Sequence, residues 1–404
     1  MYCVEVFLSL TVFHGGLKKT MNGRVVLRGR SRNRYMKILH VGASASLKQV
    51  NGVNAAVWLI STEQALLGHE VTLLLDSPPD LDAQQFAEQT GIGLAYVGAN
   101  SLRFDARATR RLIEEKAPDI VHRHSVFIPR HAFLCMLLRK SKIPYIITPH
   151  AMSGQLLKRG RIRKWLYGLF VEKPRFRRAA GITGVTPREG RDIAKYVGNY
   201  RGPIRCIFNP IDASQMGGYA WNISISPKKV VYLGRYDVMT KGLDVLLEIA
   251  RALPADVEVH LYGTRDRKTQ GWFDELTKTL PANVTINGPV FGVDKVKALS
   301  GASMYIQTSR WETFGISIAE AMFLGVPCAL AETVNLSEVF RENDLGLVLP
   351  SEPGGAAKVL SAMLHDEAKL TDCSKRGRAF AEKHFEAQAI AKEYVTFYRE
   401  VLRR

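Results

Sequence analysis

The sequence has few cysteines and no cysteine pair. Its five cysteines in 404 residues are scattered singly, and no C-x-x-C pattern occurs. A disulfide-rich secreted scaffold is therefore excluded, because such scaffolds need several paired cysteines. The scatter also argues against a zinc knuckle or an iron–sulfur site, and it fits a reducing compartment. The cysteines are Cys3, Cys135, Cys206, Cys328 and Cys373.

Long hydrophobic runs are also missing. No uncharged apolar stretch reaches the length of about 18 residues that a membrane-spanning helix needs. Val4–Phe13 is apolar but short, and it precedes the first basic run, which reverses the order of a signal peptide. We expect residues 1–36 to be an extension that is disordered or precedes the natural start, with Met21 or Met36 as candidate first residues.

Acidic residues are scarce in the first half of the chain. Residues 1–200 carry 31 Lys/Arg and 14 Asp/Glu, whereas the remaining residues carry 25 and 24, and the whole chain has a net charge of +18. A protein that is basic in one half is expected to meet an anion there, such as nucleic acid, a phospholipid surface or a phosphorylated substrate. The apolar share of 46% and the charged share of 23% are those of an ordinary globular protein.

Short apolar runs alternate with helical patterns along both halves of the chain. This order predicts parallel sheets with helices on both faces, and the pattern restarts after Tyr219. Gly202–Ile225 breaks both periods, so we place the hinge there. The sequence predicts two doubly wound α/β domains, residues 37–212 and 213–385, with the ligand site in the cleft between them.

The expected strands are Lys37–Gly42, Val71–Leu75, Ile120–His122, Tyr145–Thr148 and Gly181–Thr183 in the first domain, and Lys229–Leu233, Val257–Tyr262, Val284–Asn287, Met304–Gln307 and Cys328–Leu330 in the second. The expected helices include Asn51–Gly68, Leu243–Ala252, Asp274–Leu280 and Gly315–Leu324.

The first segment that contains candidate ligand-binding residues is Val230–Asp244, VVYLGRYDVMTKGLD. A strand ends at Gly234, Arg235 follows, and Lys241 lies just before a helix. A guanidinium, an ammonium and a helix N-terminus around one point make a natural pyrophosphate cradle. A solvated loop with two exposed cations is the alternative.

The second segment is Ser309–Pro327, SRWETFGISIAEAMFLGVP. Glu312 and Glu320 flank a helix start at Gly315, so both carboxylates can reach one pocket and accept hydrogen bonds from sugar or ribose hydroxyls. Backbone N–H groups at the glycine can meet an anion without an intervening side chain. Taken alone, two such glutamates would more often be surface residues or residues that stabilise the helix dipole.

Together the two segments resemble one family. G-R-x-x-x-x-x-K-G-L-D, followed about seventy residues later by S-x-x-E-x-F-G-x-x-x-x-E-A-M-x-x-G-x-P, is similar to the donor half of retaining nucleotide-sugar glycosyltransferases of the GT-B type, closest to the large fourth family of that classification. Asn51–Asn54 (NGVN) and the later L-G-H-E-V resemble the opening of its acceptor domain. Ile207–Asp212 resembles its linker I-P-N-G-x-D, with Pro210 in the place of glycine.

Pro149–Met152 (PHAM) resembles the P-H-G-M of bacterial enzymes of exopolysaccharide and lipopolysaccharide assembly, with Ala151 as a departure. The resemblance implies that Arg235 and Lys241 neutralise the leaving diphosphate and that Glu320 binds the ribose. Glu312 would hold the donor sugar or the region next to the diphosphate. It further implies donor contacts at Gly52, His150, Gly234, Gly263, Val290, Phe314, Gly315 and Ile316, with catalytic roles for His150, Arg235, Lys241 and Glu312.

The donor half has no D-x-D motif after a strand, so we expect transfer without a metal and without a cofactor. Retention of anomeric configuration is implied by the resemblance alone, and we assign no nucleophile. The resemblance also implies that residues 386–404 form a helix that crosses back to the first domain.

The segment Lys158–Arg178 holds nine Lys/Arg and one glutamate, interleaved with Trp165, Phe170 and several leucines. This pattern favours docking on anionic lipid, and a charged helix face is the simpler alternative. We therefore expect a cytoplasmic protein, peripheral on the inner face of the membrane, with a UDP- or GDP-linked donor and a lipid-linked or polysaccharide-precursor acceptor.

Three other interpretations stay open. A soluble glucan or disaccharide-phosphate synthase has the same fold, although the basic first half argues mildly against it. A nucleic-acid-binding protein would explain the pI of about 9.7, but no DNA or RNA motif occurs, so we expect no nucleic-acid partner. A catalytically dead sugar-nucleotide-binding subunit is disfavoured because Arg235, Lys241, Glu312 and Glu320 are all present.

Overall fold

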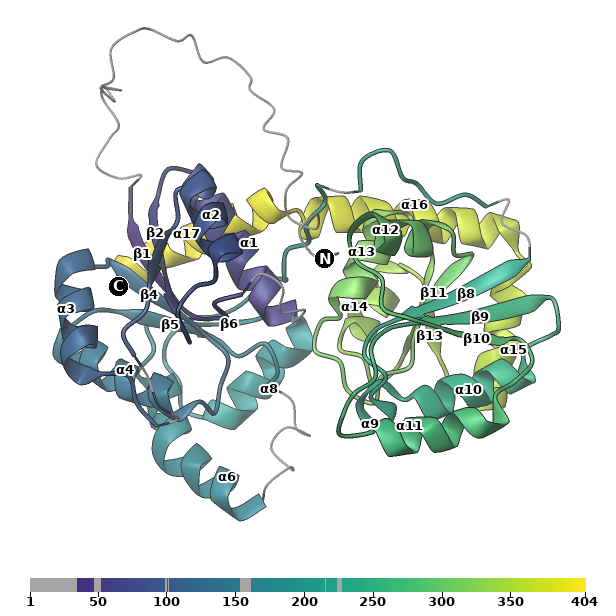
Figure 1. Cartoon of the computed structure of the whole chain (residues 1–404), viewed down its shortest axis with the longest axis horizontal. Helices are drawn as coiled ribbons and strands as arrows, with labels where there is room; N and C mark the ends of the chain where they lie inside the picture. Colours follow the sequence, from purple (N-terminus) through teal and green to yellow (C-terminus); the bar gives the residue numbers. More distant parts are fainter. Residues whose placement is uncertain are drawn as a thin grey trace, which may run out of the picture.

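The computed structural model describes residues 35–46, 52–98, 100, 102–152, 161–214, 216–223 and 227–404. Nearly all of the predicted N-terminal extension, 1–36, therefore lies outside the described residues, as does Asn51 of the NGVN motif. Two domains, each built on one parallel sheet, lie beside each other (Figure 1). Their strand orders are β3-β2-β1-β4-β5-β6-β7 and β10-β9-β8-β11-β12-β13. The prediction of a GT-B arrangement of two doubly wound domains is confirmed.

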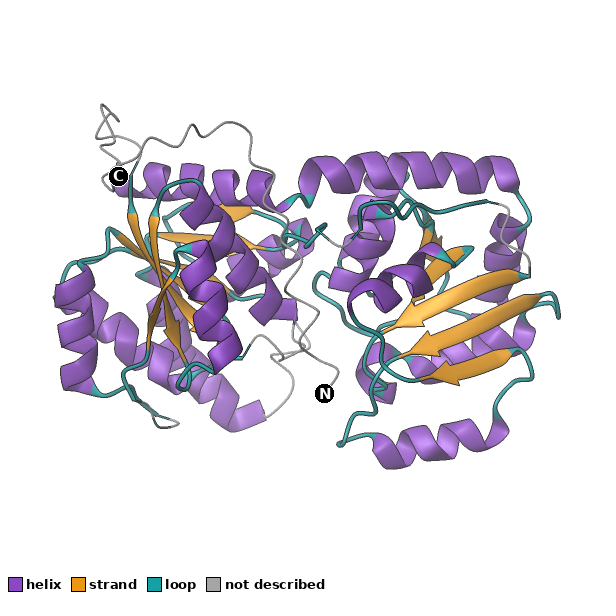
Figure 2. Ribbon diagram, turned by 45° about the horizontal axis from the view of Figure 1, so that its top comes forward, coloured by secondary structure: helices purple, strands orange, loops and turns teal. Residues whose placement is uncertain are grey.

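The N-terminal sheet carries helices on both faces, as Figure 2 shows. Most of its strands read as continuous buried runs, because a covered parallel sheet hides both faces from water. The short edge strands β3 and β7 are half-buried throughout. In β4 all five residues, IVHRH, are buried although three of them are polar. The strands are β1 (Lys37–Ala43), β2 (Glu70–Leu75), β3 (Gly93–Ala95), β4 (Ile120–His124), β5 (Tyr145–Thr148), β6 (Gly181–Gly184) and β7 (Ile204–Cys206).

Local sequence explains several helix limits in this domain. Asp80, Asp105 and Thr186 each accept a hydrogen bond from the backbone of the first turn that follows. The helices are α1 (Gly52–Leu66), α2 (Leu81–Thr90), α3 (Ala106–Lys116), α4 (Pro129–Lys140), α6 (Arg161–Tyr167), a π-helix at Gly168–Glu172, α7 (Lys173–Arg177) and α8 (Pro187–Val197).

The C-terminal domain repeats this plan with six strands. They are β8 (Lys228–Leu233), β9 (Val257–Tyr262), β10 (Val284–Asn287), β11 (Met304–Gln307), β12 (Cys328–Ala331) and β13 (Leu347–Leu349). Its helices are α9 (Val238–Lys241), α10 (Leu243–Ala252), α11 (Gln270–Leu276), a 3-10 turn at Thr277–Thr279, α12 (Gly292–Ser300), α13 (Ile316–Phe323), α14 (Leu336–Asn343), α15 (Pro353–Leu364), α16 (Glu367–His384) and α17 (Ala387–Leu402).

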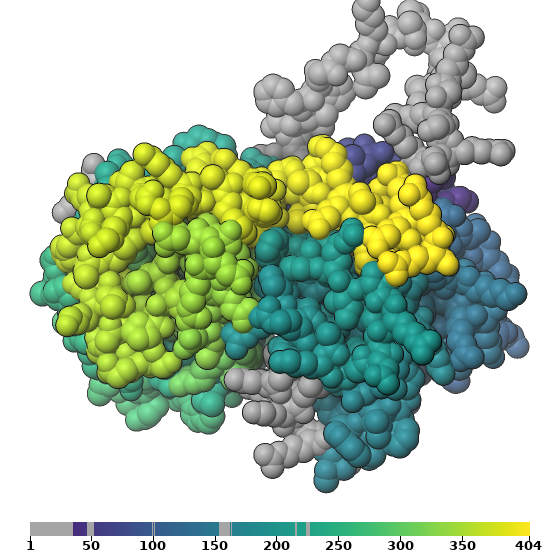
Figure 3. All heavy atoms as spheres, turned by 180° about the vertical axis from the view of Figure 1, so that it is seen from behind, coloured from purple at the N-terminus to yellow at the C-terminus, as the bar shows by residue number. Residues whose placement is uncertain are grey.

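The last two helices join the domains. α16 packs on α13 of the C-terminal domain, and α17 packs on α1 of the N-terminal domain. Seen from behind, these helices run in yellow across both halves of the molecule (Figure 3). Tyr394, Phe397 and Tyr398 of α17 are fully buried in one core cluster with Ile38 and Ile60. The core of the first domain is therefore completed by the end of the chain.

Two details of the predicted layout are wrong. The expected helix Asp274–Leu280 begins earlier, at Gln270, and ends at Leu276, because the threonines of the following 3-10 turn and then Pro281 disfavour a further α-helical turn. The expected hinge Gly202–Ile225 contains β7, which pairs with β6. A three-residue edge strand is too short to display an alternating period, and β3 and β13 were not predicted for the same reason.

Candidate active site

The residues predicted to bind the donor lie where the strand order of the second sheet reverses. β8 connects onward to β9 on one side and lies beside β11 on the other, so the carboxyl ends of β8 and β11 flank the reversal point. The helix α13 begins beside them. The Ser317 hydroxyl in its first turn donates a hydrogen bond to the Leu233 carbonyl at 3.3 Å. Ligands of doubly wound sheets bind at such a point.

Two glycines in this region have no room for a side chain. A Cβ at Gly263 would lie 1.8 Å from the carbonyl oxygen of Gly234, so the turns after β8 and β9 touch through bare backbone. Gly315 has φ +77°, and a Cβ there would meet Ile318 at 2.6 Å. The predicted donor contacts Gly263 and Gly315 are therefore glycines for a structural reason, which leaves their backbone open to a ligand, as is the backbone of Gly234.

Three ion pairs bring the predicted charged residues together with new partners. Lys241 pairs with Glu312, which joins one residue from each of the two donor motifs. Arg235 pairs with Asp266 at 2.5 Å, and Lys295 pairs with Glu320 at 2.6 Å. Asp266 and Lys295 were not predicted. The six side chains balance in charge.

The two motif segments are also locked together through Arg310. Its guanidinium makes a bidentate pair with Asp244 at 2.8 and 2.5 Å, and its backbone N–H donates to the Thr240 carbonyl at 3.0 Å. Burial raises the pKa of Asp244, but the hydrogen bonds from Arg310 outweigh burial and hold it below its usual value. This pair fixes the helix start beside Lys241.

The other predicted donor residues, Phe314 and Val290, differ in which of their atoms a ligand can reach. The Phe314 ring is buried against Phe208 and Phe385, with ring centroids 6.1 and 5.2 Å apart, so only its backbone is available to a ligand. Val290 is half-buried and follows the turn in which the Gly288 carbonyl accepts from the Gly263 N–H at 3.3 Å.

The N-terminal domain approaches this region through Gly52. A Cβ at Gly52 would lie 3.1 Å from the Ile316 side chain, so the first residue of α1 meets the first residue of α13 across the domain boundary. Asn54 holds the preceding loop: its amide oxygen accepts from the Ser44 N–H at 2.8 Å and its nitrogen donates to the Ser46 carbonyl. The reversal points of the two sheets therefore face each other.

His150 lies in the turn after β5 with φ +61°, a left-handed conformation that is uncommon outside glycine. The strain falls on His150, and Ala151 is exposed without positive φ, so alanine fits where the family has glycine. Glu189 of α8 supports the turn by accepting from the Met152 N–H at 2.8 Å, and burial raises the pKa of Glu189 to about 7. No described contact joins His150 to the donor residues.

Behind His150 lie three fully buried histidines, His40, His122 and His124. Their nearest ring nitrogens lie within 4.8 Å of one another, which satisfies the spacing of a cation site. All six nitrogens already have a hydrogen-bond partner, however, and we assign no metal there. Burial lowers the pKa of His40 to about 4 and those of His122 and His124 well below their usual range, so the rings are neutral at pH 7.

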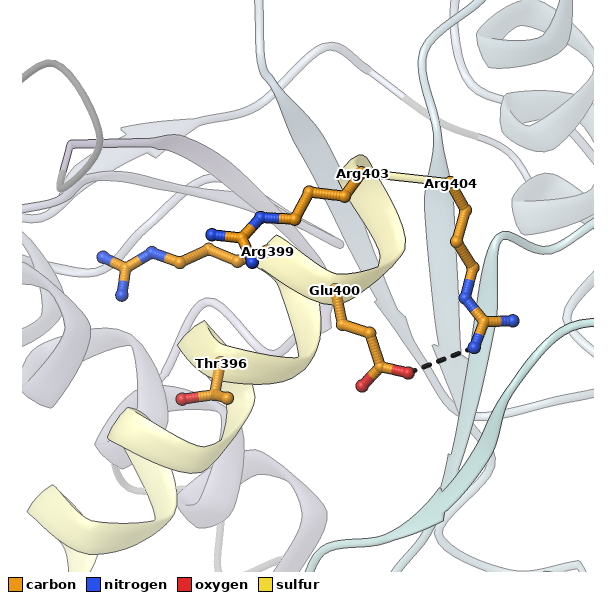
Figure 4. Close-up of a pocket in the computed structure, with 5 residues that line it drawn as sticks. All are labelled: Thr396, Arg399, Glu400, Arg403 and Arg404. Atoms are coloured by element: carbon orange, nitrogen blue, oxygen red, sulfur yellow. Dashed lines mark hydrogen bonds and ion pairs between the residues drawn. The ribbon is translucent and has the colours of Figure 1, made fainter.

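A separate hollow of about 430 Å³ opens at the end of α17 (Figure 4). It is lined by Thr396, Arg399, Glu400, Arg403 and Arg404. Glu400 accepts from Arg404 at 3.2 Å and from Arg205 at 2.6 Å, so its charge is already compensated. The hollow contains none of the predicted site residues, and we give it no role in the chemistry.

Sequence reasoning missed Asp266, Lys295, Arg310, Glu189 and the buried histidines. Only the histidines carried a readable signal, because H-x-H at His122 and His124 places two imidazoles on one face of a strand end. The other partners are ordinary charged residues whose roles depend on the tertiary structure.

Two sequence families match the chain along most of its length. Residues 50–215 match Glycosyltransferase Family 4, and residues 227–366 match Glycosyl transferases group 1. The boundary between the two matches falls in the linker before β8, so each match corresponds to one of the two domains.

Relatives and solved structures agree with these families. A phosphatidyl-myo-inositol mannosyltransferase of Mycolicibacterium smegmatis is 26% identical over 341 residues, which is 78% of this chain and 82% of that protein. A glycogen synthase of Mycobacterium tuberculosis is 22% identical, over 90% of this chain and 94% of that protein. The structure of Anabaena Alr3699/HepE in complex with UDP and glucose superposes with a TM-score of 0.68 at 16% identity, covering 90% of this chain and all of that one. This chain is a glycosyltransferase of the GT-B type, with a family 4 domain followed by a group 1 domain.

Proposed function

We propose that this enzyme transfers a sugar from a UDP- or GDP-linked donor to a lipid-linked or polysaccharide-precursor acceptor, with retention of configuration and without a metal. The main support for this proposal is the set of three cations around the reversal point of the second sheet: Arg235, Lys241 and Lys295. Anabaena Alr3699/HepE has been solved in complex with UDP and with UDP-glucose, which supports a nucleotide-sugar donor here.

The ion pairs suit a ligand that arrives as an anion. The Arg235 side chain is 58% exposed, so its pair with Asp266 contributes little and can be exchanged for a diphosphate oxygen. Negative charge grows on the diphosphate as the sugar leaves, and preorganised cations stabilise that charge. Arg235 and Lys241 would supply this stabilisation.

The two glutamates keep acceptor capacity beside their lysines. A carboxylate offers about four lone-pair sites, and the described ion pairs use one oxygen each of Glu312 and Glu320. The remaining sites can accept hydrogen bonds from hydroxyls, the sugar at Glu312 and the ribose at Glu320. We assign no protein nucleophile to the transfer.

The test of the donor is a thermal-shift comparison of UDP, GDP and ADP. A ligand at one hundred times its dissociation constant stabilises by about 2.7 kcal/mol, so the preferred base should stand apart. Lys241→Ala should abolish the shift, and Lys358→Ala on the exposed face of α15 serves as the matched control. Equal and small shifts with all three nucleotides in the wild-type protein would contradict a nucleotide site.

Metal independence is tested separately. Donor turnover should persist in excess EDTA, because the two cations that stabilise the leaving diphosphate are side chains. Complete loss of turnover that returns with Mn²⁺ would contradict the proposed diphosphate site.

A membrane surface is the proposed location of the acceptor. In α6 and the π-helix after it, Ile162, Trp165 and Phe170 are 74%, 63% and 70% exposed, and Leu166 and Leu169 are also exposed. Residues 153–160 of the predicted basic segment lie outside the described residues. Exposed aromatic and aliphatic side chains beside basic residues favour attachment to anionic lipid. None of the described helices is long and apolar enough to span a bilayer.

Liposome co-sedimentation tests this surface. The protein should bind anionic vesicles at low salt, bind neutral vesicles less, and be released as salt rises. The double variant Trp165→Ser/Phe170→Ser should lose binding, whereas Trp272→Ser, at an exposed tryptophan of the other domain, should keep it. Equal binding to both vesicle types would contradict docking, and a soluble glucan acceptor would then be favoured.

A further inference from the structure

A line of buried hydrogen bonds runs inward from His150 to the helix α1. His150 Nε2 lies 2.9 Å from His124 Nδ1, His124 Nε2 lies 3.0 Å from His40 Nδ1, and His40 Nε2 lies 2.8 Å from the Gln64 side-chain oxygen. Gln64 is fully buried, as are the two inner histidines. We call these four residues the histidine line.

Each link in the histidine line limits the next one. A neutral imidazole has one N–H and one bare nitrogen, so each ring that accepts at one end must donate at the other. Burial keeps the rings neutral, lowering the pKa of both His40 and His150 to about 4. The tautomers of the three rings therefore depend on one another. The group at one end of the line fixes the tautomer of every ring.

The side-chain amide of Gln64 sets the tautomer of His40. Its amide nitrogen donates to the Tyr398 hydroxyl at 3.2 Å, which leaves its oxygen for His40. Because an amide oxygen only accepts, His40 must carry its proton on Nε2 and accept on Nδ1. The same step then places a proton on Nε2 of His124 and on Nε2 of His150.

A second branch leads from the amide nitrogen of Gln64 toward α17. The Tyr398 hydroxyl, which accepts from Gln64, lies 2.6 Å from His122 Nδ1, and His122 Nε2 lies 2.7 Å from the Thr148 hydroxyl. Thr148 in turn bonds Thr183. Gln64 thus stands at a fork, with an acceptor toward the histidine line and a donor toward α17.

We propose that Gln64 is a positioning residue, which acts through His40 and His124 to make Nδ1 of His150 a bare nitrogen that accepts a hydrogen bond from a hydroxyl of the substrate. This nitrogen is buried and makes none of the described hydrogen bonds. The side chain of Asn209, whose buried oxygen also makes none, contacts the His150 ring and is the competing partner for Nδ1. A left-handed backbone at His150 holds the ring in the line and leaves Nδ1 at the free end. Only the last step, the hydroxyl ligand, rests on the proposed function.

The tautomer is measured directly by ¹⁵N NMR of the full chain labelled at histidine, with the His150 signals assigned through His150→Gln. The ligand-free wild-type protein should give a protonated Nε2 and a bare Nδ1 at His150. A proton on Nδ1, donated to the side-chain oxygen of Asn209, or rapid averaging between the two forms, would overturn the proposal. This measurement needs no turnover, so it stands apart from the test of the enzyme's function.

Variants at Gln64 test the direction of control. Gln64→Leu removes the acceptor, so the His150 signals should shift toward averaged tautomers and turnover of UDP-glucose or GDP-mannose should fall roughly tenfold, the loss of one hydrogen bond. Gln64→Glu should restore both, because a carboxyl oxygen still accepts from His40. Thr62→Val, which removes another buried hydrogen bond of α1, should change neither.

The outcomes separate the two proposals. If Gln64→Leu unfolds, the wild-type spectrum and Gln64→Glu still decide the tautomer. A bare Nδ1 together with wild-type turnover in His150→Gln would keep the histidine line and remove His150 from the reaction. A reversed tautomer with strongly reduced turnover in His150→Gln would do the opposite.

Discussion

The two domains present opposite kinds of polar surface to the boundary between them. The C-terminal domain places full charges there as ion pairs, such as Lys241 with Glu312 and the half-exposed Arg235 with Asp266. The N-terminal domain places neutral imidazoles there, buried and bonded to neutral partners. Charges that are paired but accessible can exchange partners with an anionic ligand, whereas a buried neutral network resists charge and fixes direction. From this difference we expect diphosphate binding on the C-terminal side and hydroxyl orientation on the N-terminal side.

The largest expected effect is acid instability confined to the N-terminal domain. A histidine whose pKa is about 4 in the folded protein and 6.5 in the unfolded chain does not change the free energy of unfolding above pH 6.5. As pH falls from 6.5 toward 4 the unfolded chain binds the proton more readily, so the domain loses stability. His40 alone accounts for about 2 kcal/mol by pH 5, and His122, His124 and His150 act in the same direction. Glu189, with its pKa raised to about 7, has the opposite slope between pH 7 and 4.5 but is a single group.

Hydrogen exchange compares the domains in one experiment. After correction for intrinsic rates, amides of β4 should lose protection between pH 7 and 5, whereas those of β8 should change little. His365 in the C-terminal domain has a pKa raised by its hydrogen bond to Asp256, so it stabilises that domain as pH falls. His365→Gln is the control and should leave the β4 slope unchanged. Equal losses in both sheets would contradict the contrast between the domains.

The second effect is on turnover. Lys241→Ala and Arg235→Ala should each reduce donor turnover by about 10²–10³-fold, the usual loss when a preorganised charge at a developing anion is removed. His150→Gln should cost roughly tenfold, because it removes one neutral hydrogen bond. Steady-state kinetics of the three variants measures these losses, and circular dichroism checks that each variant is folded. Wild-type turnover in either cation variant, or a larger loss at His150 than at Lys241, would reverse the assignment of the two sides.

The smallest effect concerns the contact between the domains. Arg191 of α8 pairs with Glu338 of α14, and the Arg191 side chain is mostly exposed. An exposed ion pair contributes about 1 kcal/mol or less. Arg191→Ala should therefore lower the melting temperature by no more than a few degrees relative to Lys358→Ala. A loss as large as that of a buried pair would mean that this contact, rather than α17, holds the domains together.

Much of the fold and the charged half of the site were predictable from sequence. Buried parallel strands are read as apolar runs, and the residues of the two donor motifs lie at strand ends and helix starts. Lys241 and Glu312 could be placed together because each follows a strand at the same edge of one sheet.

The neutral half was not predictable. The partners in the histidine line are separated by 26, 84 and 24 residues, and Gln64 meets Tyr398 across 334 residues. A single histidine or glutamine carries no period and no charge pattern that would mark such a partner. Short edge strands such as Ile204–Cys206 escaped prediction for a related reason, since three residues do not establish an alternation.

The position of α17 has a consequence for how the protein is made. An N-terminal domain ordinarily folds while the rest of the chain is still being synthesised. Here the first domain lacks part of its core until Phe397 and Tyr398 have left the ribosome, after the whole second domain. Until then His122 lacks the Tyr398 hydroxyl and one face of α1 stays uncovered. The domain that is translated first therefore lacks part of its core until synthesis ends, and a chain that ends just before α17 contains the core residues of the second domain but not all of those of the first.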